Sequence, residues 1–334
     1  METKELLQKY HSLLGELDQE ASKPWGGNED HLRKSDYFIT PEIVEHFADY
    51  AIQSIGFEGG NDFPAELFSG SQVRKVKFGE DFEKIWVSKF KTYLSTSLKN
   101  LFGHPFAEPD EVISLLTMDG VVGGRGFAIE LAGKKFFTSS HIARVASRAY
   151  TVRGQLGKWP GSLLEIGGGH GRFIRDIAKC SDRTKLFYCD LPFNMLLAAR
   201  YLSKVFPGKV NLVWLEGDEI DENSQINIVS PHLIHRLPSD IEICCNFLSF
   251  QHMSEENLAY YWSALEEKSV KQVLHLNRNR HLHPGEVDLT DYPFGRFKIT
   301  HEQNRASIYV TDTEGNQHPN EFFIVEQHLE LGPA

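Results

Sequence analysis

Cysteine is scarce in this chain of 334 residues, which has four in all, Cys180, Cys189, Cys244 and Cys245. None is spaced as Cys-x-x-Cys, so the sequence offers neither a disulfide framework nor a zinc ribbon. Long apolar runs are missing as well, because no stretch approaches the roughly 20 residues that a membrane helix needs. The first 21 residues have no basic or apolar region typical of a secretory signal. We therefore expect a cytoplasmic protein that makes no membrane contact.

An excess of positive charge is also lacking. The chain has 35 basic and 46 acidic residues, a net charge of −11, and such a field repels phosphate backbones unless basic residues are concentrated locally. The best basic run, residues 74–78, is short and is typical of a solvated helix or strand face. We expect no nucleic-acid partner.

The chain divides into two parts by its apolar pattern. Residues 1–150 have mainly helical spacing, with a short hairpin expected around Gly133. This region is expected to cover the substrate site or to mediate a homodimer. Residues 151–334 alternate short apolar strands with helices, which predicts a doubly wound, mostly parallel α/β sheet of Rossmann-like type. The last strands are joined by loops alone, which predicts an antiparallel edge. The expected strands are 162–166, 185–190, either 210–215 or 226–230, 241–247 and 270–277.

The segment SLLEIGGGHGRF, Ser162–Phe173, places four glycines in the first strand-to-helix turn of this sheet. Missing Cβ atoms permit positive φ angles and let a ligand lie against the backbone. A P-loop would need Gly-Lys-Ser/Thr, which does not follow. The dinucleotide pattern Gly-x-Gly-x-x-Gly is incomplete, because its third position is Arg172 counted from Gly167, or Ile174 counted from Gly169.

What fits is an acidic residue followed by x-Gly-x-Gly-x-Gly, from Glu165 to Gly171, which resembles motif I of the class I S-adenosylmethionine-dependent methyltransferases. The resemblance implies a loop that passes under the methionine and ribose portions of the donor. Asp190 ends the next strand, where an acidic residue is expected to accept hydrogen bonds from the ribose diol. For adenine the sequence favours Ser230 over Glu216 and Asp218, which belong to an acidic run.

A second block resembles the sugar O-methyltransferases, a bacterial family associated with polysaccharide and natural-product gene clusters. The resemblance covers residues 145–280. The family pattern has Ser-Phe-Gln-Glu-Met where this chain has His252 in place of Glu. Imidazole can also serve as a general base at neutral pH, so His252 either takes that role or marks a changed acceptor. The motifs that carry the resemblance are residues 164–169, Asp190-Leu191-Pro192, Ser249-Phe250-Gln251-x-Met253 and Leu276-Asn277-Arg278.

Together these observations define one set of expected site residues. His252 is expected to be catalytic, Gln251 and Arg278 to contact the acceptor, and no residue to ligate a metal. A weaker alternative is a metal held by His275, His281 and His283 with Glu286 or Asp288, and either Arg148 or Arg153 is expected to pair with the donor carboxylate. The expected donor-binding residues are Tyr150, Glu165, Gly167, Gly168, Gly169, Asp190, Leu191, Ser230, Asn246 and Phe247.

The resemblance implies an S-adenosylmethionine-dependent O-methyltransferase that acts on a hydroxyl of a sugar or glycosylated small molecule. Two alternatives stay open. One keeps the fold but takes a phenol, carboxylate, amine or peptide-derived scaffold as acceptor. The other is a methyltransferase fold that binds the donor without catalysis.

Overall fold

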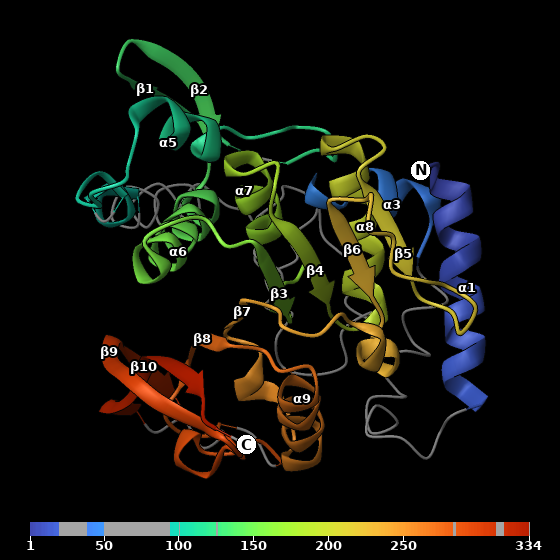
Figure 1. Cartoon of the computed structure of the whole chain (residues 1–334). Coiled ribbons are helices and arrows are strands. Elements are labelled where there is room, and N and C mark those ends of the chain that lie inside the picture. Colours follow the sequence, from blue (N-terminus) through green and yellow to red (C-terminus); the bar gives the residue numbers. More distant parts are fainter. Residues whose placement is uncertain are drawn as a thin grey trace.

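The protein is described by a computed structural model for residues 1–19, 39–49, 94–99, 101–124, 126–282, 285–311 and 317–333. Its centre is an eight-stranded sheet of order β5-β6-β4-β3-β7-β8-β10-β9 (Figure 1). The first six strands in this order are parallel to their neighbours, and the last two are antiparallel. The predicted fold class is therefore confirmed. The strands are β3 (Ser162–Ile166), β4 (Lys185–Cys189), β5 (Val210–Val213), β6 (Ile226–Val229), β7 (Ile243–Phe247), β8 (Gln272–Arg278), β9 (Phe297–Thr311) and β10 (Gln317–Leu331).

Helices cover both faces of the sheet, because successive strand residues point to opposite sides. Leu163 packs with one group of helices, and Leu164 packs with the other. No described helix is long and apolar enough to cross a membrane. On the first face lie α1 (Thr3–Gln19), α3 (Pro41–Glu45), η2 (Phe47–Asp49), α6 (Ser140–Leu156), α7 (Arg172–Cys180) and α8 (Pro192–Val205), and on the second lie η5 (Pro231–Arg236), α9 (Glu255–Glu267) and η7 (Leu289–Asp291).

Both candidate third strands exist. β5 and β6 are parallel neighbours, and β6 lies between β5 and β4. The strand next to β4, which ends just before Asp190, is therefore β6. β6 itself ends just before Ser230. The sequence left this choice open because both segments are short, apolar and rich in branched residues.

The N-terminal part adds a helix and a hairpin at one end of the molecule. α5 (Pro109–Leu116) precedes β1 (Phe127–Leu131) and β2 (Lys134–Thr138), which pair antiparallel and project from the body (Figure 1). Ala132 and Gly133 both have positive φ, as a tight hairpin turn requires, so the hairpin expected at Gly133 is confirmed. The helices expected within residues 50–93 lie outside the described residues. The predicted domain boundary at residue 150 falls inside α6, and the division into domains stays a prediction.

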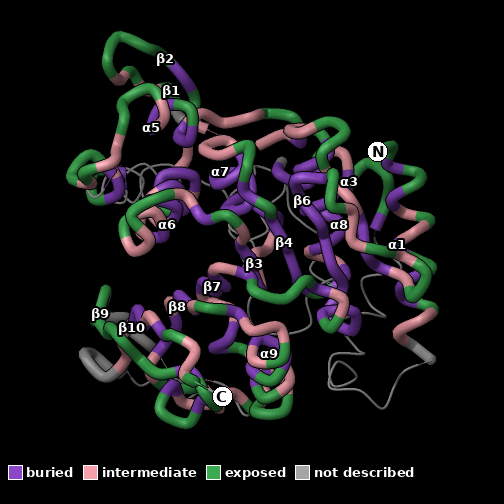
Figure 2. The backbone as a smooth tube through the Cα atoms, viewed as in Figure 1, coloured by how far each residue is buried: buried purple, intermediate pink, exposed green. Residues whose placement is uncertain are grey.

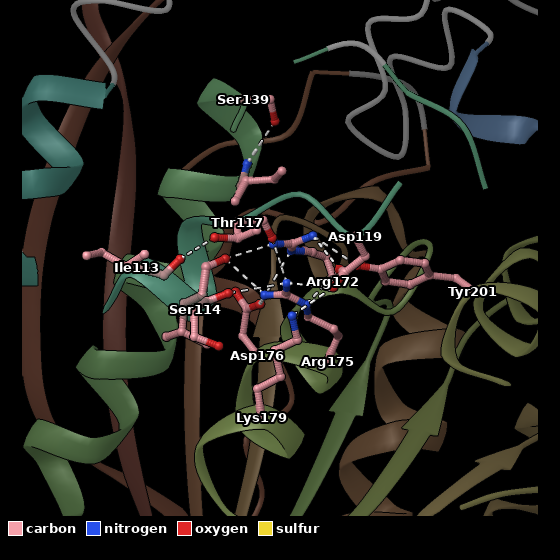
Figure 3. A network of polar contacts seen from close by, with 12 residues as sticks. Ile113, Ser114, Thr117, Asp119, Ser139, Arg172, Arg175, Asp176, Lys179 and Tyr201 are labelled. Carbon is pink, nitrogen blue, oxygen red and sulfur yellow. Dashed lines mark hydrogen bonds and ion pairs between the residues drawn. The ribbon is translucent and has the colours of Figure 1, made fainter. Parts of the chain in front are cut away.

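Burial is deepest in the sheet and in the helices beside it, whereas the hairpin is largely exposed (Figure 2). Most buried side chains are apolar, but a cluster of charged side chains is buried between α7 and the segment after α5 (Figure 3). Arg175 holds Asp119 with two hydrogen bonds, from Nε and Nη2, both of 2.9 Å. It also donates to the carbonyl oxygens of Leu115 (2.9 Å) and Thr117 (2.7 Å).

This cluster ties the N-terminal part to the helix that follows the glycine turn. Burial alone raises the pKa of Asp119, but the guanidinium groups of Arg175 and Arg172 outweigh that effect and hold it well below its usual range. Tyr201 donates a further hydrogen bond of 2.6 Å to Asp119 from α8. Both buried carboxylates, Asp119 and Asp176, form ion pairs with Arg175, although Oδ2 of Asp176 and Nε of Arg172 have no hydrogen-bond partner among the described residues. We interpret this ion-paired cluster as structural.

Replacing Arg175 with Leu should lower the free energy of unfolding by about 3–5 kcal/mol, because it leaves buried carboxylates and carbonyl groups without their donor. Urea unfolding followed by circular dichroism measures the change. The control is Lys134→Ala, which removes an exposed pair with Asp110 and should leave the midpoint unchanged. Equal midpoints for the two variants would contradict a structural role.

Candidate functional site

The glycine turn between β3 and α7 has a backbone that only glycine adopts easily. Gly167, Gly169 and Gly171 have φ angles of 72°, 64° and 82°. A Cβ atom on Gly167 would collide with the side chain of Ser249, which follows β7. The bare backbone therefore serves internal packing as well as any ligand, because it lets the loop after β7 close against the turn.

Asp190 lies beside this turn at the end of β4. Its carboxylate accepts hydrogen bonds from the backbone N–H groups of Gly169 (2.7 Å) and Leu191 (2.7 Å), from the Asn194 amide (2.9 Å) and from the Tyr188 hydroxyl (3.1 Å). Burial raises the pKa of Asp190 above its ordinary value, and these donors counter part of that effect. Leu191, next in the chain, is an exposed apolar side chain at the same edge. The structure thus brings the second predicted acidic residue to the predicted turn.

Glu165 places a second carboxyl group under the turn. Its side chain is 2% exposed, and Oε2 has no hydrogen-bond partner among the described residues. A Cβ atom on Gly168 would collide with this carboxyl group. Burial raises the pKa of Glu165, Asp190 also raises it and Arg148 lowers it, and together these effects bring the pKa to about 8. A buried carboxyl oxygen without a partner is costly unless a ligand supplies one.

Arg148 supplies the positive charge at this place. It comes from α6, and its guanidinium lies 4.8 Å from the centre of the Phe247 ring. Burial and the neighbouring Arg144 lower its pKa to about 9, whereas Glu165 acts in the opposite direction. Arg148 and Glu165 influence each other without forming an ion pair, because the described ion pairs include neither residue. A pKa of about 8 keeps Glu165 largely neutral at pH 7, so the guanidinium of Arg148 is the charge that a ligand meets here.

Asn246 connects the end of β7 with the end of β3. Its Nδ2 donates to the carbonyl oxygen of Ile166 (2.8 Å), and its Oδ1 accepts from the backbone N–H of Phe250 (3.1 Å) and the Asn277 amide (3.1 Å). Its side chain is fully buried. Leu248 follows with a φ of 66°, so the chain turns sharply out of β7. Asn246 thus holds the two loops together.

His252 lies in η6 (Phe250–His252), directly after this turn. Its Nδ1 is 2.9 Å from Oε1 of Glu286, and its side chain is 46% exposed, whereas that of Glu286 is 7% exposed. Arg278 donates from Nη2 to Oε2 of Glu286 (3.1 Å). A half-exposed imidazole that rests on a buried carboxylate has the arrangement of an oriented general base.

Ser230 is fully buried at the end of β6, where its Oγ is 2.8 Å from Nδ1 of His232. Asp218, an alternative candidate for adenine, accepts from two backbone N–H groups and forms an ion pair of 2.8 Å with Lys9 of α1. Glu216 pairs with Arg236. The acidic loop and Ser230 are thus both engaged in contacts within the protein, and the assignment of Ser230 to adenine stays a prediction.

Tyr150 lies apart from the turn. It packs in the apolar cluster of α5 and α6, and its hydroxyl donates to Glu111. Arg153 forms an ion pair of 2.9 Å with the same Glu111. Of the two arginines considered for the donor carboxylate, only Arg148 lies beside Glu165.

Of the histidines considered for a metal, the two that the structure describes have different surroundings. His275 is fully buried among aromatic rings, and burial lowers its pKa to about 3. His281 is exposed and pairs with Asp288 at 2.6 Å, and His283 lies outside the described residues. Among the residues that the structure describes, no group of three or more His, Cys, Asp or Glu side chains could hold a metal ion.

Two roles were not assigned from the sequence. Glu286 was considered only as a metal ligand, yet it is the partner of His252, 34 positions away. Asn277 was noted within a motif, but its bonds to Asn246 and Gln251 were not foreseen. The pairing of Glu286 with His252 has no signal in the sequence, so only the structure could provide it.

No protein-family model matches the chain, and no curated protein matches it. Solved structures that resemble it include magnesium protoporphyrin IX methyltransferase from Synechocystis PCC 6803, with bound SAH, which is 11% identical over 57% of this chain and 83% of that chain, with a TM-score of 0.38. TehB from Haemophilus influenzae is 11% identical over 60% of this chain and 69% of that chain, with a TM-score of 0.39. The O-methyltransferase region of StiE is 8% identical over 58% and 75%, with a TM-score of 0.39. Likenesses this weak carry no weight for function.

Replacing Glu165 with Gln tests the state of the buried carboxyl group. Its pKa is raised from 4.5 to about 8, so the stability tied to the neutral form is fully present below 4.5 and is lost as the pH rises toward 8. In this window the free energy of unfolding of the wild type should fall by up to about 1.4 kcal/mol per pH unit. The variant should lack this slope in urea unfolding at a series of pH values. Parallel pH profiles for the two proteins would refute the shift.

Proposed function

We propose that this chain is an S-adenosylmethionine-dependent methyltransferase whose donor lies across the glycine turn. The observation that carries the proposal is the juxtaposition of the turn with Asp190, Glu165 and Arg148. A donor of this type has a ribose diol, an ammonium group and a carboxylate. Asp190 can accept from the diol in place of the Tyr188 hydroxyl, which also has the carbonyl oxygen of Gly169 as an acceptor. The unpartnered Oε2 of Glu165 can accept from the ammonium, and Arg148 can donate to the carboxylate. The chemical groups of the site therefore fit the donor.

The reaction that we propose is methylation of a hydroxyl group. The bound donor supplies an activated methyl group on a sulfonium, and most of its reactivity is intrinsic. The protein contributes alignment, exclusion of water and a base. His252 takes the proton that the acceptor hydroxyl loses, and Glu286 stabilises the imidazolium that forms.

For the acceptor we propose a sugar or a glycosylated small molecule. Support comes from the two segments that resemble the sugar O-methyltransferases, because they meet in space. The backbone N–H of Gln251 donates to Oδ1 of Asn277 (3.1 Å), and the backbone N–H of Arg278 donates to Oε1 of Gln251 (3.0 Å). Segments 26 and 27 positions apart in sequence thus form one structure beside His252.

Substituting Arg148 with Leu should weaken donor binding by roughly 10–100-fold, because a charged hydrogen bond contributes about 1.5–3 kcal/mol. Isothermal titration calorimetry with S-adenosylmethionine and its demethylated product measures this. Arg153→Leu is the matched control from the same helix, since its partner is Glu111, and it should leave the affinity unchanged. If neither wild type nor control binds the donor, the proposed function is wrong.

Changing His252 to Ala should lower the rate of methyl transfer by roughly 10²–10⁴-fold while donor affinity stays the same. The assay uses labelled donor with a panel of sugars, glycosides, phenols and amines. His281→Ala removes a second histidine that has a carboxylate partner, and it should retain activity. Turnover of a phenol or amine alone would show that the sugar assignment is wrong.

A further inference from the structure

The orientation of the Gln251 side chain is determined by a backbone group. Its Oε1 lies 3.0 Å from the backbone nitrogen of Arg278. A backbone N–H can only donate, so the amide oxygen has to face it. The other end of the side chain, the Nε2 group, then lies 3.1 Å from Nε2 of His252.

This contact determines which nitrogen of His252 carries the proton. A side-chain amide nitrogen is a donor only, so Nε2 of His252 has to accept from it. A neutral imidazole has one ring proton, which must then be on Nδ1. Nδ1 lies 2.9 Å from Oε1 of Glu286, and an ionised carboxylate only accepts. Two independent neighbours thus require the same tautomer.

One contact opposes this arrangement. Nη2 of Arg278 lies 3.4 Å from Nδ1 of His252 and would donate to an unprotonated Nδ1. The same Nη2 donates at 3.1 Å to Glu286 and at 3.2 Å to the carbonyl oxygen of Gln251. The distance of 3.4 Å exceeds the usual range for an N–H donor, and the carboxylate at 2.9 Å forms the stronger, charge-assisted bond. We expect the carboxylate to prevail.

The position of Gln251 is fixed in turn by a series of amide groups. Its backbone N–H donates to Oδ1 of Asn277, whose Nδ2 donates to Asn246, whose Nδ2 donates to the carbonyl oxygen of Ile166. Each amide is oriented by a group that can only donate or only accept. The series therefore runs from the start of the glycine turn to the side chain beside His252.

We infer that Gln251 and Glu286 are positioning residues, which hold His252 in the tautomer with the proton on Nδ1 and leave the lone pair of Nε2 to act as the base. The inference rests on the proposed role of His252 in proton removal. In the reaction the hydroxyl of the acceptor replaces the Gln251 amide as the partner of Nε2. Its oxygen–hydrogen bond breaks, the proton forms a bond to Nε2, and Glu286 accepts from Nδ1–H of the resulting imidazolium.

The test is nitrogen NMR of the full chain with ¹⁵N-labelled histidine at about pH 8, where an ordinary imidazole is neutral. The His252 signals are identified by their loss in His252→Asn. We expect the shifts of a protonated Nδ1 and an unprotonated Nε2. A wild-type spectrum with the proton on Nε2 would overturn the inference without any activity measurement.

Two variants extend the test. Gln251→Glu places a carboxylate oxygen beside Nε2, so the ring should become protonated at that nitrogen. Glu286→Gln should reduce kcat/KM by about 10–100-fold with unchanged donor affinity. An unaltered His252 spectrum in Gln251→Glu would count against the role of the amide. If that variant fails to fold, the wild-type spectrum still shows which ring nitrogen of His252 carries the proton.

The control is Asp288→Asn, which removes the carboxylate of the exposed His281 pair and should leave the His252 spectrum unchanged. The inference and the proposed function fail in different ways. A protonated Nδ1 without methyl transfer to any acceptor would retain the tautomer and reject the function. Methyl transfer by a protein whose His252 has the proton on Nε2 would reject the tautomer and retain the function.

Discussion

The hydrogen bond from Asn246 to the carbonyl oxygen of Ile166 is the contact on which the arrangement of the site depends. It joins the ends of β3 and β7, the two central strands that lie next to each other in the sheet. Because Gly167 has no side chain, Ser249 can close against it directly after this bond. The turn that we assign to the donor and the loop that carries His252 are therefore held together by the Asn246 amide and by the close approach of Ser249 to Gly167.

Buried charge is used in two different ways in this chain. Around Arg175 every carboxylate meets a guanidinium or hydroxyl group, and the result joins α7 to the segment after α5 (Figure 3). Around the glycine turn the opposite holds, because Glu165 lacks a partner for Oε2 and does not pair with Arg148. Ion-paired networks stabilise a fold, whereas a buried carboxyl group that meets no cation in an ion pair is a cost that function can explain. The contrast within one structure is a physical reason to place the ligand at the turn.

Much of this architecture could be predicted from the sequence because it depends on local pattern. The β3 turn and Asp190 follow from short apolar runs, glycine spacing and an acidic residue at a strand end. The hairpin at Gly133 follows from a turn that needs positive φ. The choice between β5 and β6 could not be made, since two similar strands compete for one place in the sheet.

The parts that could not be predicted depend on long-range register. Tyr150 and Arg148 are two positions apart in one helix, so only packing decides which of them faces the turn and which faces Glu111. Glu286 contacts His252 from 34 positions away in the sequence, and no hydrophobic periodicity predicts this contact. The tautomer of His252 depends on a backbone N–H of β8, which has no sequence signal at all.

A crystal structure with the demethylated donor bound is the most direct measurement of the central claim. The account predicts the ribose hydroxyl groups at Asp190, the amino-acid end between Glu165 and Arg148, and the sulfur facing the loop of Ser249 and His252. A ligand bound elsewhere, or an Asp190 carboxylate turned away from it, would contradict the account.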